Sequence, residues 1–436
     1  MNILIKNCTL ISMSEARERL EKNIDILIKD KKINKIGVNL TTELDTKVIN
    51  AQDLICLPGL INSHAHIPMS IFRETLDGYT LQDWLNNKIW PMEDKLTPED
   101  IYYASILSFI EMISTGTVLV NDQYYMSDET IRAALDIGAR VQLTRTINDV
   151  ANLQEKRLTE LKDFIEKYNN KYDNITLNVG IHGLYTTGAD TLKKCIEIAK
   201  NNNLPIHMHF CENEQETIDI KNNFNVNSPI VVLKQYFSDL HLILAHSVKV
   251  SDEEIKELSK MNVHIAHCPI SNLRLGSGIA PIQKMLDNGI NVSLGTDGQG
   301  SGSNLDLFDT MKFSALLQKT DNVTNMDAYE VLKMATINGA KALALDNKIG
   351  SIDEGKDADI ILVDLNTEVC QPYGNVFSNL VYNCKGTNVQ STIINGSIVM
   401  DNRNIVGIDK QKIFDECSKI IDRIQRWFFI WKRKNE

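Results

Sequence analysis

The sequence has little of what marks fibrous, disulfide-bonded or membrane-spanning chains. Only 9 of its 436 residues are proline and 22 are glycine, which excludes a collagen-like or low-complexity chain. Its eight cysteines are scattered without a C-x-x-C pair, which indicates free thiols in a reducing compartment. No apolar run approaches the ~18 residues that a membrane span requires. What remains is an ordinary globular composition, with 43% hydrophobic and 24% charged residues.

Positive charge is also in the minority, with 46 Lys and Arg against 57 Asp and Glu, a net charge of −11. Because an acidic protein repels phosphate backbones, we expect no nucleic-acid partner. The first residues are charged from Lys6 onward and contain no long apolar core, so we expect no signal peptide. With no membrane segment or export signal, we expect a cytoplasmic protein without a membrane partner.

The pattern of the chain changes twice along its length. Residues 1–57 and 351–407 contain short, β-branched, turn-bounded runs, whereas residues 58–350 alternate strand-length apolar runs with amphipathic helical stretches. This pattern predicts a (β/α)₈ TIM-type barrel with a small β-sandwich domain built from both chain ends. The eight expected barrel strands contain the runs LINSHAH, GTVLVNDQ, ARVQLTRT, TLNVGIHG, PIHMHF, LILAHS, NVHIAHCP and NVSLGTDG.

Residues 408–436 have the pattern of an amphipathic helix at the C-terminus. Apolar residues recur there at spacings of three and four, at Ile413, Cys417, Ile420, Ile424, Trp427 and Trp431. Such stripes are mostly packing faces, so we expect the helix to dock on the body of the protein or on a second copy in a homo-oligomer. A membrane-surface or partner helix is the less favoured interpretation.

Histidines and carboxylates lie at the ends of several expected strands. His64 and His66 stand two residues apart on a strand and therefore point to the same side. An isolated pair of this kind is more often structural than metal-binding. In the run IHMHF, either His207 or His209 could be a ligand, and His209 is nearer the end of the strand where barrel active sites lie.

Three further groups follow strand runs in the same way. Glu212 lies just beyond His209, His246 ends the run LILAH, and Asp297 follows NVSLGT between glycines. Each residue taken singly could be a structural histidine or a turn-capping acid. Together they deliver imidazoles and carboxylates to one face of the expected barrel, which indicates a metal centre.

The segments PGLINSHAHIPMSIFRE, HMHFCENEQE, LAHSVKVSDEEI, HCPISNLRLGSGIAP and LGTDGQGSGSNLDLF resemble the amidohydrolase superfamily. More narrowly, they are similar to its 5-methylthioadenosine/S-adenosylhomocysteine deaminases, and the similarity covers nearly the whole chain. The resemblance implies one divalent metal ion, with zinc expected and iron or manganese as alternatives. It implies the metal ligands His64, His66, His209 and Asp297, which leave a coordination position open.

The same resemblance implies hydrolytic deamination at adenine C6 of S-adenosylhomocysteine, 5-methylthioadenosine or adenosine, giving the inosyl product and ammonia. In that reaction Asp297 accepts a proton from the attacking water, His246 orients the water, and Glu212 protonates ring N1. Both Asp297 and Glu212 would also contact the substrate. The H-x-E and P-C-x-x-C pattern of the other zinc deaminases is missing from the sequence.

Five further residues match positions that the resemblance assigns to substrate binding. Glu93 would hold the ribose hydroxyls, Trp84 would line the nucleoside pocket, and His182 would contact the base. Arg145 would grip the carboxylate of a homocysteine substituent, a role suited to a guanidinium group. Arg157 could do the same or could be a solvated charge on a helix.

The chain departs from the family pattern close to the substrate. It has Ile-His-Gly-Leu around His182, and Ser247 stands where cysteine is common. These differences leave open a related enzyme that acts on guanine, cytosine or an s-triazine, as an aminohydrolase or chlorohydrolase. A non-catalytic barrel is disfavoured because every expected ligand and acid/base residue is in the sequence.

Overall fold

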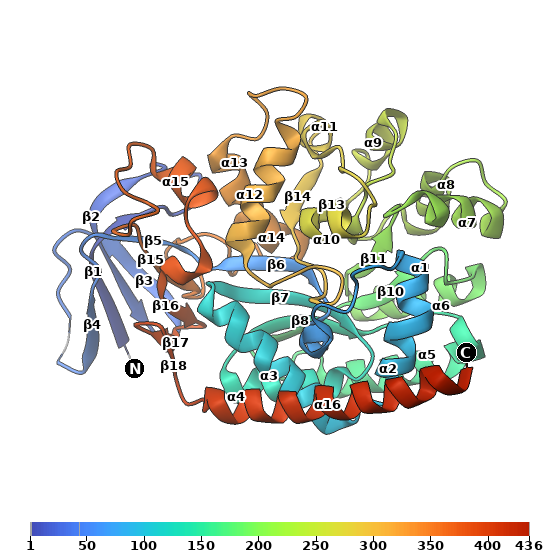
Figure 1. Cartoon of the computed structure of the whole chain (residues 1–436). Helices are drawn as coiled ribbons and strands as arrows, with labels where there is room; N and C mark the ends of the chain where they lie inside the picture. The colour runs from blue at the N-terminus through green and yellow to red at the C-terminus, as the bar shows by residue number, and fades with distance from the viewer. Residues whose placement is uncertain (1, 43, 436) are drawn as a thin grey trace.

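The middle of the chain forms a closed parallel barrel in the computed structural model, which describes residues 2–42 and 44–435 (Figure 1). Its strands are β6 (Leu60–Ala65), β7 (Thr117–Tyr124), β8 (Arg140–Arg145), β9 (Ile175–Leu177), β10 (Val179–Gly183), β11 (Ile206–Phe210), β12 (Leu242–His246), β13 (Val263–His267) and β14 (Asn291–Leu294). β9 and β10 are two parts of one segment interrupted at Asn178, since β9 pairs with β8 and β10 with β11. Each predicted run contains a strand, which confirms the barrel.

The barrel closes where β14 returns to β6. The backbone N–H groups of Thr296 and Asp297 donate to the carbonyl oxygen of His64, at 3.1 and 3.0 Å. Gly295 permits this approach, because a Cβ atom there would lie 2.9 Å from the Cβ of His64. Closure of the barrel therefore also brings the acidic end of β14 beside the histidines of β6.

Helices cover the outside of the barrel and follow its strands. They are α3 (Pro98–Ser114), α4 (Ser127–Ile137), α5 (Gln154–Tyr168), α6 (Ala189–Asn202), α7 (Glu214–Phe224), α8 (Pro229–Phe237), α9 (Asp252–Leu258), α10 (Pro269–Arg274), α11 (Ile282–Asp287), α12 (Leu307–Gln318), α13 (Ala328–Met334) and α14 (Ile337–Ala342). Local sequence sets where they begin. For α3, Thr97 and Asp100 form a reciprocal capping box and Pro98 occupies the first turn.

A segment between β6 and α3 lies across the mouth of the barrel, and we call residues 67–93 the cover segment. It contains η1 (Ile67–Phe72), α1 (Leu81–Trp84), the π-helical turn η2 (Leu85–Ile89) and α2 (Trp90–Glu93). Its two tryptophans and its terminal glutamate line the cavity described below.

Both ends of the chain contribute to one nine-stranded sheet. Its main path runs through β18 (Asn404–Ile405), β17 (Ser397–Asp401), β16 (Val389–Ile394), β15 (Ile360–Asp364), β5 (Leu54–Pro58), β1 (Asn2–Leu10), β2 (Glu21–Lys29) and β3 (Lys32–Gly37), and β4 (Thr46–Asn50) pairs with β1. β5 and β15 are antiparallel neighbours, with Pro58 opposite Ile360. The chain therefore leaves the sheet beside the place where it returns. A short helix, α15 (Val376–Tyr382), lies between β15 and β16.

A buried ionic contact joins the barrel to this sheet. Arg140, at the start of β8, lies 2.9 Å from Asp359 and 3.1 Å from Asp357, measured between guanidinium nitrogen and carboxylate oxygen. The Arg140 and Asp359 side chains are almost fully buried. Because removing one partner would leave the other charge buried and unpaired, this contact holds the two parts in a fixed relation.

The C-terminal helix α16 (Lys410–Asn435) packs along α3 on the outside of the barrel (Figure 1). The first four residues of the predicted apolar stripe are buried: Ile413, Cys417, Ile420 and Ile424. Arg423 pairs with Asp100 and donates to the carbonyl oxygen of Lys95. The helix therefore docks on the body of the protein, one of its two predicted positions. None of the helices within the described residues is long and apolar enough to cross a membrane.

Candidate active site

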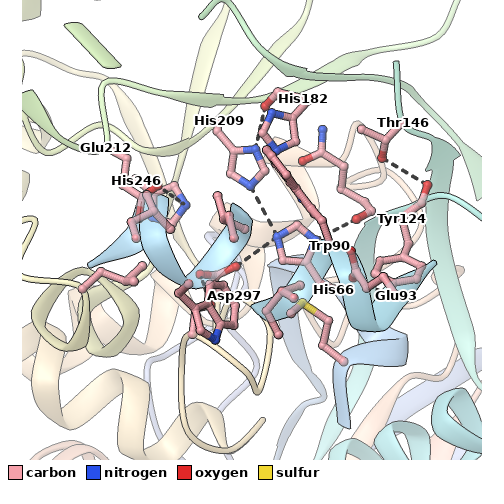
Figure 2. A pocket seen from close by; sticks show the side chains of 18 of the residues that line it. His66, Trp90, Glu93, Tyr124, Thr146, His182, His209, Glu212, His246 and Asp297 are labelled. Carbon is pink, nitrogen blue, oxygen red and sulfur yellow. Dashed lines mark hydrogen bonds and ion pairs between the residues drawn. The ribbon is translucent and has the colours of Figure 1, made fainter. Parts of the chain in front are cut away.

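Three histidines and an aspartate converge at the mouth of the barrel, and Figure 2 labels three of the four, His66, His209 and Asp297. His64 and His66 come from the end of β6, His209 from β11, and Asp297 from the loop after β14. Their candidate ligand atoms all lie within 4.8 Å of one another. His66 Nε2 is 3.1 Å from Asp297 Oδ1 and 3.4 Å from His209 Nε2. The structure thus gathers the four residues that the resemblance implied as metal ligands.

The other ring nitrogen of each histidine is held by the protein. Nδ1 of His66 donates to the carbonyl of Gln123 at 2.7 Å, and Nδ1 of His209 donates to the carbonyl of His182 at 2.6 Å. Nδ1 of His64 lies 2.9 Å from Nε2 of His207. These bonds direct all three Nε2 atoms toward the common centre. His207 was the alternative to His209 as a ligand. It contacts the Nδ1 side of His64, away from the cluster, and is not one of the four clustered residues.

The protonation states of these residues fit a divalent cation. Burial lowers the pKa of His64 to about 4 and that of His209 well below its ordinary value, so both rings are neutral with a free lone pair. His64 Nε2 is buried without a hydrogen-bond partner. Burial opposes ionisation of Asp297, but the imidazoles of His64 and His66, whose Nε2 atoms lie 3.4 and 3.1 Å from its Oδ1, outweigh burial and hold its pKa well below its usual range. Three imidazoles and one carboxylate form a donor set for zinc-like ions.

His66 differs from the other two histidines because it lies nearest to the carboxylate. Burial disfavours its charged form, but the hydrogen bond and charge of Asp297 outweigh burial and raise its pKa to about 9. Without a metal ion this ring is protonated near neutral pH. Metal binding would therefore release a proton here.

Two serines that sequence reasoning missed hold the other oxygen of Asp297. The hydroxyls of Ser271 and Ser301 donate to Oδ2 at 2.5 and 2.6 Å, which leaves Oδ1 toward the histidines. The backbone of Asp297 is in the left-handed region, with φ of 61°. Such a conformation costs a non-glycine residue about 1–3 kcal/mol. Residues in this conformation are found most often at functional sites.

Glu212 and His246 stand beside the cluster. Glu212 follows β11, and His246 ends β12 with a left-handed φ of 73°. His246 Nε2 is 4.0 Å from Glu212 Oε2, while its Nδ1 lies 2.8 Å from Oδ1 of Asn272. Burial raises the pKa of Glu212, whereas the charges of Glu212 and Asp297 outweigh burial and raise that of His246. Glu212 Oε1 is buried and unpaired.

Glu216 fixes the turn that carries Glu212. Its carboxylate accepts hydrogen bonds from the backbone N–H groups of Cys211 and Glu212, at 2.8 and 2.7 Å. Cys211 is left-handed, with φ of 49°, so the turn is bent sharply at the strand end. Burial raises the pKa of Glu216 to about 7. The four-residue spacing from Glu212 was the only sequence signal for this contact.

The cluster opens into a cleft at the mouth of the barrel, and residues of the cover segment form part of its lining. Trp84, Glu93 and His182, all predicted substrate contacts, line it. Glu93 Oε1 accepts a hydrogen bond from the hydroxyl of Tyr124 at 2.5 Å, and burial raises the pKa of Glu93 to about 7. Sequence reasoning missed Trp90, which also lines the cleft (Figure 2).

The two predicted arginines line an adjoining outer cavity, which shares Trp90, Glu93, Tyr124, Tyr125 and Thr146 with the inner cleft. Arg145 is already paired with Asp128 at 2.8 Å and with Glu160 at 3.2 Å. Nη1 of Arg157 donates to backbone carbonyls, including that of Val150 at 2.9 Å. Both guanidinium groups are therefore near the cleft, but each has partners within the protein.

A parallel barrel with imidazole and carboxylate ligands at the carboxyl ends of its strands defines a metal-dependent barrel enzyme, and the site binds a divalent metal ion. The chain belongs to the amidohydrolase family, whose model matches residues 55–399. It is 41% identical over 428 residues to the 5-methylthioadenosine/S-adenosylhomocysteine deaminase of Thermoanaerobacter pseudethanolicus, covering 96% of this chain and 98% of the relative.

Two further comparisons agree with this assignment. The 5'-deoxyadenosine deaminase of Methanocaldococcus jannaschii is 40% identical over 411 residues, covering 92% of this chain and 96% of that protein. The crystal structure of an adenosine deaminase from Xanthomonas campestris with bound zinc superposes with a TM-score of 0.91 at 27% identity, covering 97% and 98% of the two chains.

Proposed function

We propose that this protein hydrolytically removes the 6-amino group from adenine nucleosides, with S-adenosylhomocysteine, 5-methylthioadenosine and adenosine as candidate substrates. The observation that carries the proposal is the meeting of the metal-ligand cluster with two acid/base residues, Glu212 and His246, in one cleft lined by Glu93. The names of relatives at 40% and 41% identity, both deaminases of adenosine derivatives, support it.

Zinc is the metal ion that we infer for the site. Three imidazole nitrogens and a carboxylate oxygen suit zinc, and the similar Xanthomonas campestris deaminase carries that ion. A divalent cation held by His64, His66, His209 and Asp297 would lower the pKa of water and so provide a nucleophile near neutral pH.

The residues beside the cluster would prepare the attack on adenine C6. Asp297 would take the proton of the attacking water, since its lowered pKa keeps the carboxylate ionised and two serine hydroxyls fix its Oδ2. His246 would hold the water through Nε2, because Asn272 fixes the other side of the ring.

Glu212 would carry the proton that makes the aromatic ring accept the attack. Burial raises its pKa, which favours the protonated form that would donate to ring N1. After attack, the proton held by Asp297 would go to the departing amine, and the Glu212 carboxylate would receive the remaining proton of the C6 hydroxyl group, so that both carboxyl groups return to their starting states. General acid/base catalysis of this kind is commonly worth about 10²–10⁴-fold in rate.

The outer part of the cleft would hold the nucleoside. Glu93 would accept hydrogen bonds from the ribose, His182 would contact the base, and Trp84 would pack against the substrate. A 5'-substituent would extend toward Arg145 and Arg157 in the adjoining cavity. Because both arginines have protein partners, a homocysteine carboxylate would have to compete with Asp128 and Glu160 for Arg145.

Ammonia release, followed with the change in absorbance from adenine to hypoxanthine, tests the proposal. Metal-replete protein would be compared on S-adenosylhomocysteine, 5-methylthioadenosine, 5'-deoxyadenosine, adenosine, adenine and guanine. We expect turnover of the nucleosides, and a loss of about 10²–10⁴-fold in Glu212→Gln. Turnover of guanine or adenine in preference to every nucleoside would contradict the proposed substrate class.

A further inference from the structure

Glu216 is a buried carboxylate beside the cleft that the proposed reaction does not use. It lies in the first turn of α7, its side chain is almost fully buried, and it is not part of the lining of the cleft. Its two oxygens accept hydrogen bonds from consecutive backbone N–H groups, those of Cys211 at 2.8 Å and Glu212 at 2.7 Å. Glu216 therefore contacts the backbone of the proposed acid without facing the substrate.

These bonds differ from those of an ordinary helix cap. Asn213 is the N-cap of α7, and its side chain accepts the backbone N–H of Glu216 at 2.9 Å. A glutamate three residues after the N-cap normally completes a capping box by bonding the backbone N–H of the N-cap residue itself. Glu216 instead reaches past Asn213 to the two residues before it. Its carboxylate therefore holds the turn after β11 and not the first residue of the helix.

The other side of this turn is bonded to the segment that follows His246. The carbonyl oxygen of Cys211 accepts the backbone N–H groups of Val248 and Lys249, at 3.0 and 2.8 Å. The N–H group of Cys211 donates to Glu216. Both backbone polar groups of Cys211 are thus fixed, so the turn sets where the proposed acid lies relative to His246.

The turn needs such support because its backbone conformation is unfavourable. Cys211, His246 and Ser247 have φ values of 49°, 73° and 49°. Non-glycine residues keep such values only where the surrounding structure holds them. An ionised carboxylate can hold two adjacent N–H groups because both of its oxygens accept and neither donates. An amide at position 216 would set its NH₂ group against one of the two N–H donors.

We propose that Glu216 is a positioning residue that acts through Glu212, by holding the turn from which the Glu212 carboxyl group reaches ring N1 of the substrate. This inference rests on the proposed function, in which Glu212 donates to N1. Glu212 Oε2 lies 4.0 Å from His246 Nε2, and Figure 2 shows the two residues side by side. Loss of the Glu216 bonds would let the turn relax and would move the Glu212 carboxyl group away from this place.

A double-substitution cycle separates a positioning role from a structural one. The value of kcat for adenosine would be measured with metal-replete wild type, Glu216→Gln, Glu212→Ala and the double variant. We expect Glu216→Gln to lower kcat by about 10- to 100-fold, the effect that a displacement of about 1 Å can cause. In the Glu212→Ala background the same change should cost less than about threefold, because the side chain that it positions is missing.

A binding measurement reports on the same contact without turnover. Purine riboside has N1 but no 6-amino group, and 1-deazapurine riboside has a carbon in place of N1. The ratio of their Kd values, measured by calorimetry, therefore gives the contribution of the contact with N1. In the wild type we expect purine riboside to bind about 10- to 100-fold more tightly, as for a hydrogen bond to a charged group. In Glu216→Gln this ratio should fall toward one.

The chain offers a matched control in Asp306, the N-cap of α12. Its two carboxylate oxygens also accept one backbone N–H each, from Phe308 at 2.9 Å and Gly386 at 2.8 Å, but it lies outside the lining of the cleft. Asp306→Asn should lower the Tm and leave the ratio of the two Kd values as in the wild type. Any effect of this variant on kcat should be the same with and without Glu212.

Two results would overturn the proposal. One is a loss of kcat in Glu216→Gln that is equally large with and without Glu212, which would mean a purely structural role. The other is an unchanged ratio of Kd values in Glu216→Gln, a result that does not need measurable turnover in Glu212→Ala.

A second variant covers the case in which Glu216→Gln does not fold. Glu216→Asp keeps both acceptor oxygens but is one methylene shorter, so it should lower the ratio of Kd values in the same direction, and an unchanged ratio would again overturn the proposal. A wild type that neither turns over nucleosides nor distinguishes the two ribosides would instead reject the proposed function, and this inference with it.

Discussion

Histidines lie at both ends of the barrel, and the two groups behave differently. At the mouth, His246 ends β12 beside Glu212 and the metal-ligand cluster. At the opposite end of the same strand, His241 stacks on His264, with ring centroids 4.2 Å apart and planes within 17°. His241 bonds the carbonyl of Ala342 at 2.8 Å, and His264 lies 2.9 Å from the amide nitrogen of Asn291.

The difference shows that the end of the strand at which a histidine lies determines its role in this barrel. The stacked pair is satisfied by backbone and amide groups, whereas the mouth leaves His64 Nε2 and Glu212 Oε1 unpaired beside a cleft. His267, at the end of β13, also has unpaired ring nitrogens, but it lies outside the lining of the cleft. An unpaired nitrogen or oxygen atom can take part in binding or catalysis only where a ligand can reach it.

The largest expected effect comes from removing a histidine at the mouth. We expect His209→Ala to lose activity to background and to bind less than one metal ion per chain, because one of four ligands is gone. Metal content by elemental analysis, measured beside turnover, checks this. A variant that kept both its metal and its activity would show that the cluster is not the metal centre.

Removing the metal ion should destabilise the mouth and with it the whole barrel. A ligand held at 1,000 times its Kd stabilises the folded state by about 4 kcal/mol. Chelation should therefore lower the Tm measurably, and added zinc should restore it. His209→Ala serves as the control, since its Tm should hardly respond to the chelator. An identical Tm with and without chelator in the wild type would refute the expectation.

The pKa of Glu93 predicts how ribose binding depends on pH. Burial raises this pKa to about 7, so the carboxylate is ionised above that pH and protonated below it. A protonated carboxyl offers one acceptor fewer to the ribose, so KM for adenosine should rise by up to about 10-fold per unit as the pH falls below 7.

The ratio of KM values for adenosine and 2',3'-dideoxyadenosine isolates this group, because other titrations affect both substrates alike. In Glu93→Gln, which does not titrate, the ratio should stay constant with pH. A ratio that changes equally in wild type and variant would assign the pH dependence to another residue.

The smallest effect on catalysis is expected at the opposite end of the barrel. His264→Ala should leave kcat and KM within about twofold of the wild type, since the stacked pair is far from the mouth along the strands. It should still lower the free energy of unfolding by about 1–3 kcal/mol, because the amide nitrogen of Asn291 loses one of its two hydrogen-bond partners. Denaturant unfolding measures the second effect. A large loss of turnover in His264→Ala would contradict the difference between the two ends of the barrel.

The fold and the ligand cluster could be predicted because both follow from strand pattern. Apolar runs that end in His or Asp mark the carboxyl ends of parallel strands, and barrel geometry then brings those ends together. His207 and His209 point to the same side of β11, so their positions along the strand separate them: His209, nearer the carboxyl end as the sequence indicated, reaches the cluster, whereas His207 contacts His64.

Other site residues could not be predicted because their contacts depend on turns and on side-chain orientation. Glu216 reaches Glu212 only through the left-handed turn at Cys211. Asn272, on α10, meets His246 at the end of β12, and Gln123 looks like any polar residue near a strand end. The domain limits at residues 57, 350 and 407 and the catalytic roles of the site residues stay predictions.

The pairing of β5 with β15 has a consequence for synthesis on the ribosome. About 300 residues separate Pro58 from its partner Ile360, so at about 5–20 residues per second β5 waits roughly 15–60 s for the strand that covers its edge. Until then the early strands of the sheet present an unpaired edge, which is open to association with other chains. The nascent chain is therefore most exposed to aggregation while its barrel is being made, and chaperone demand should peak in that interval.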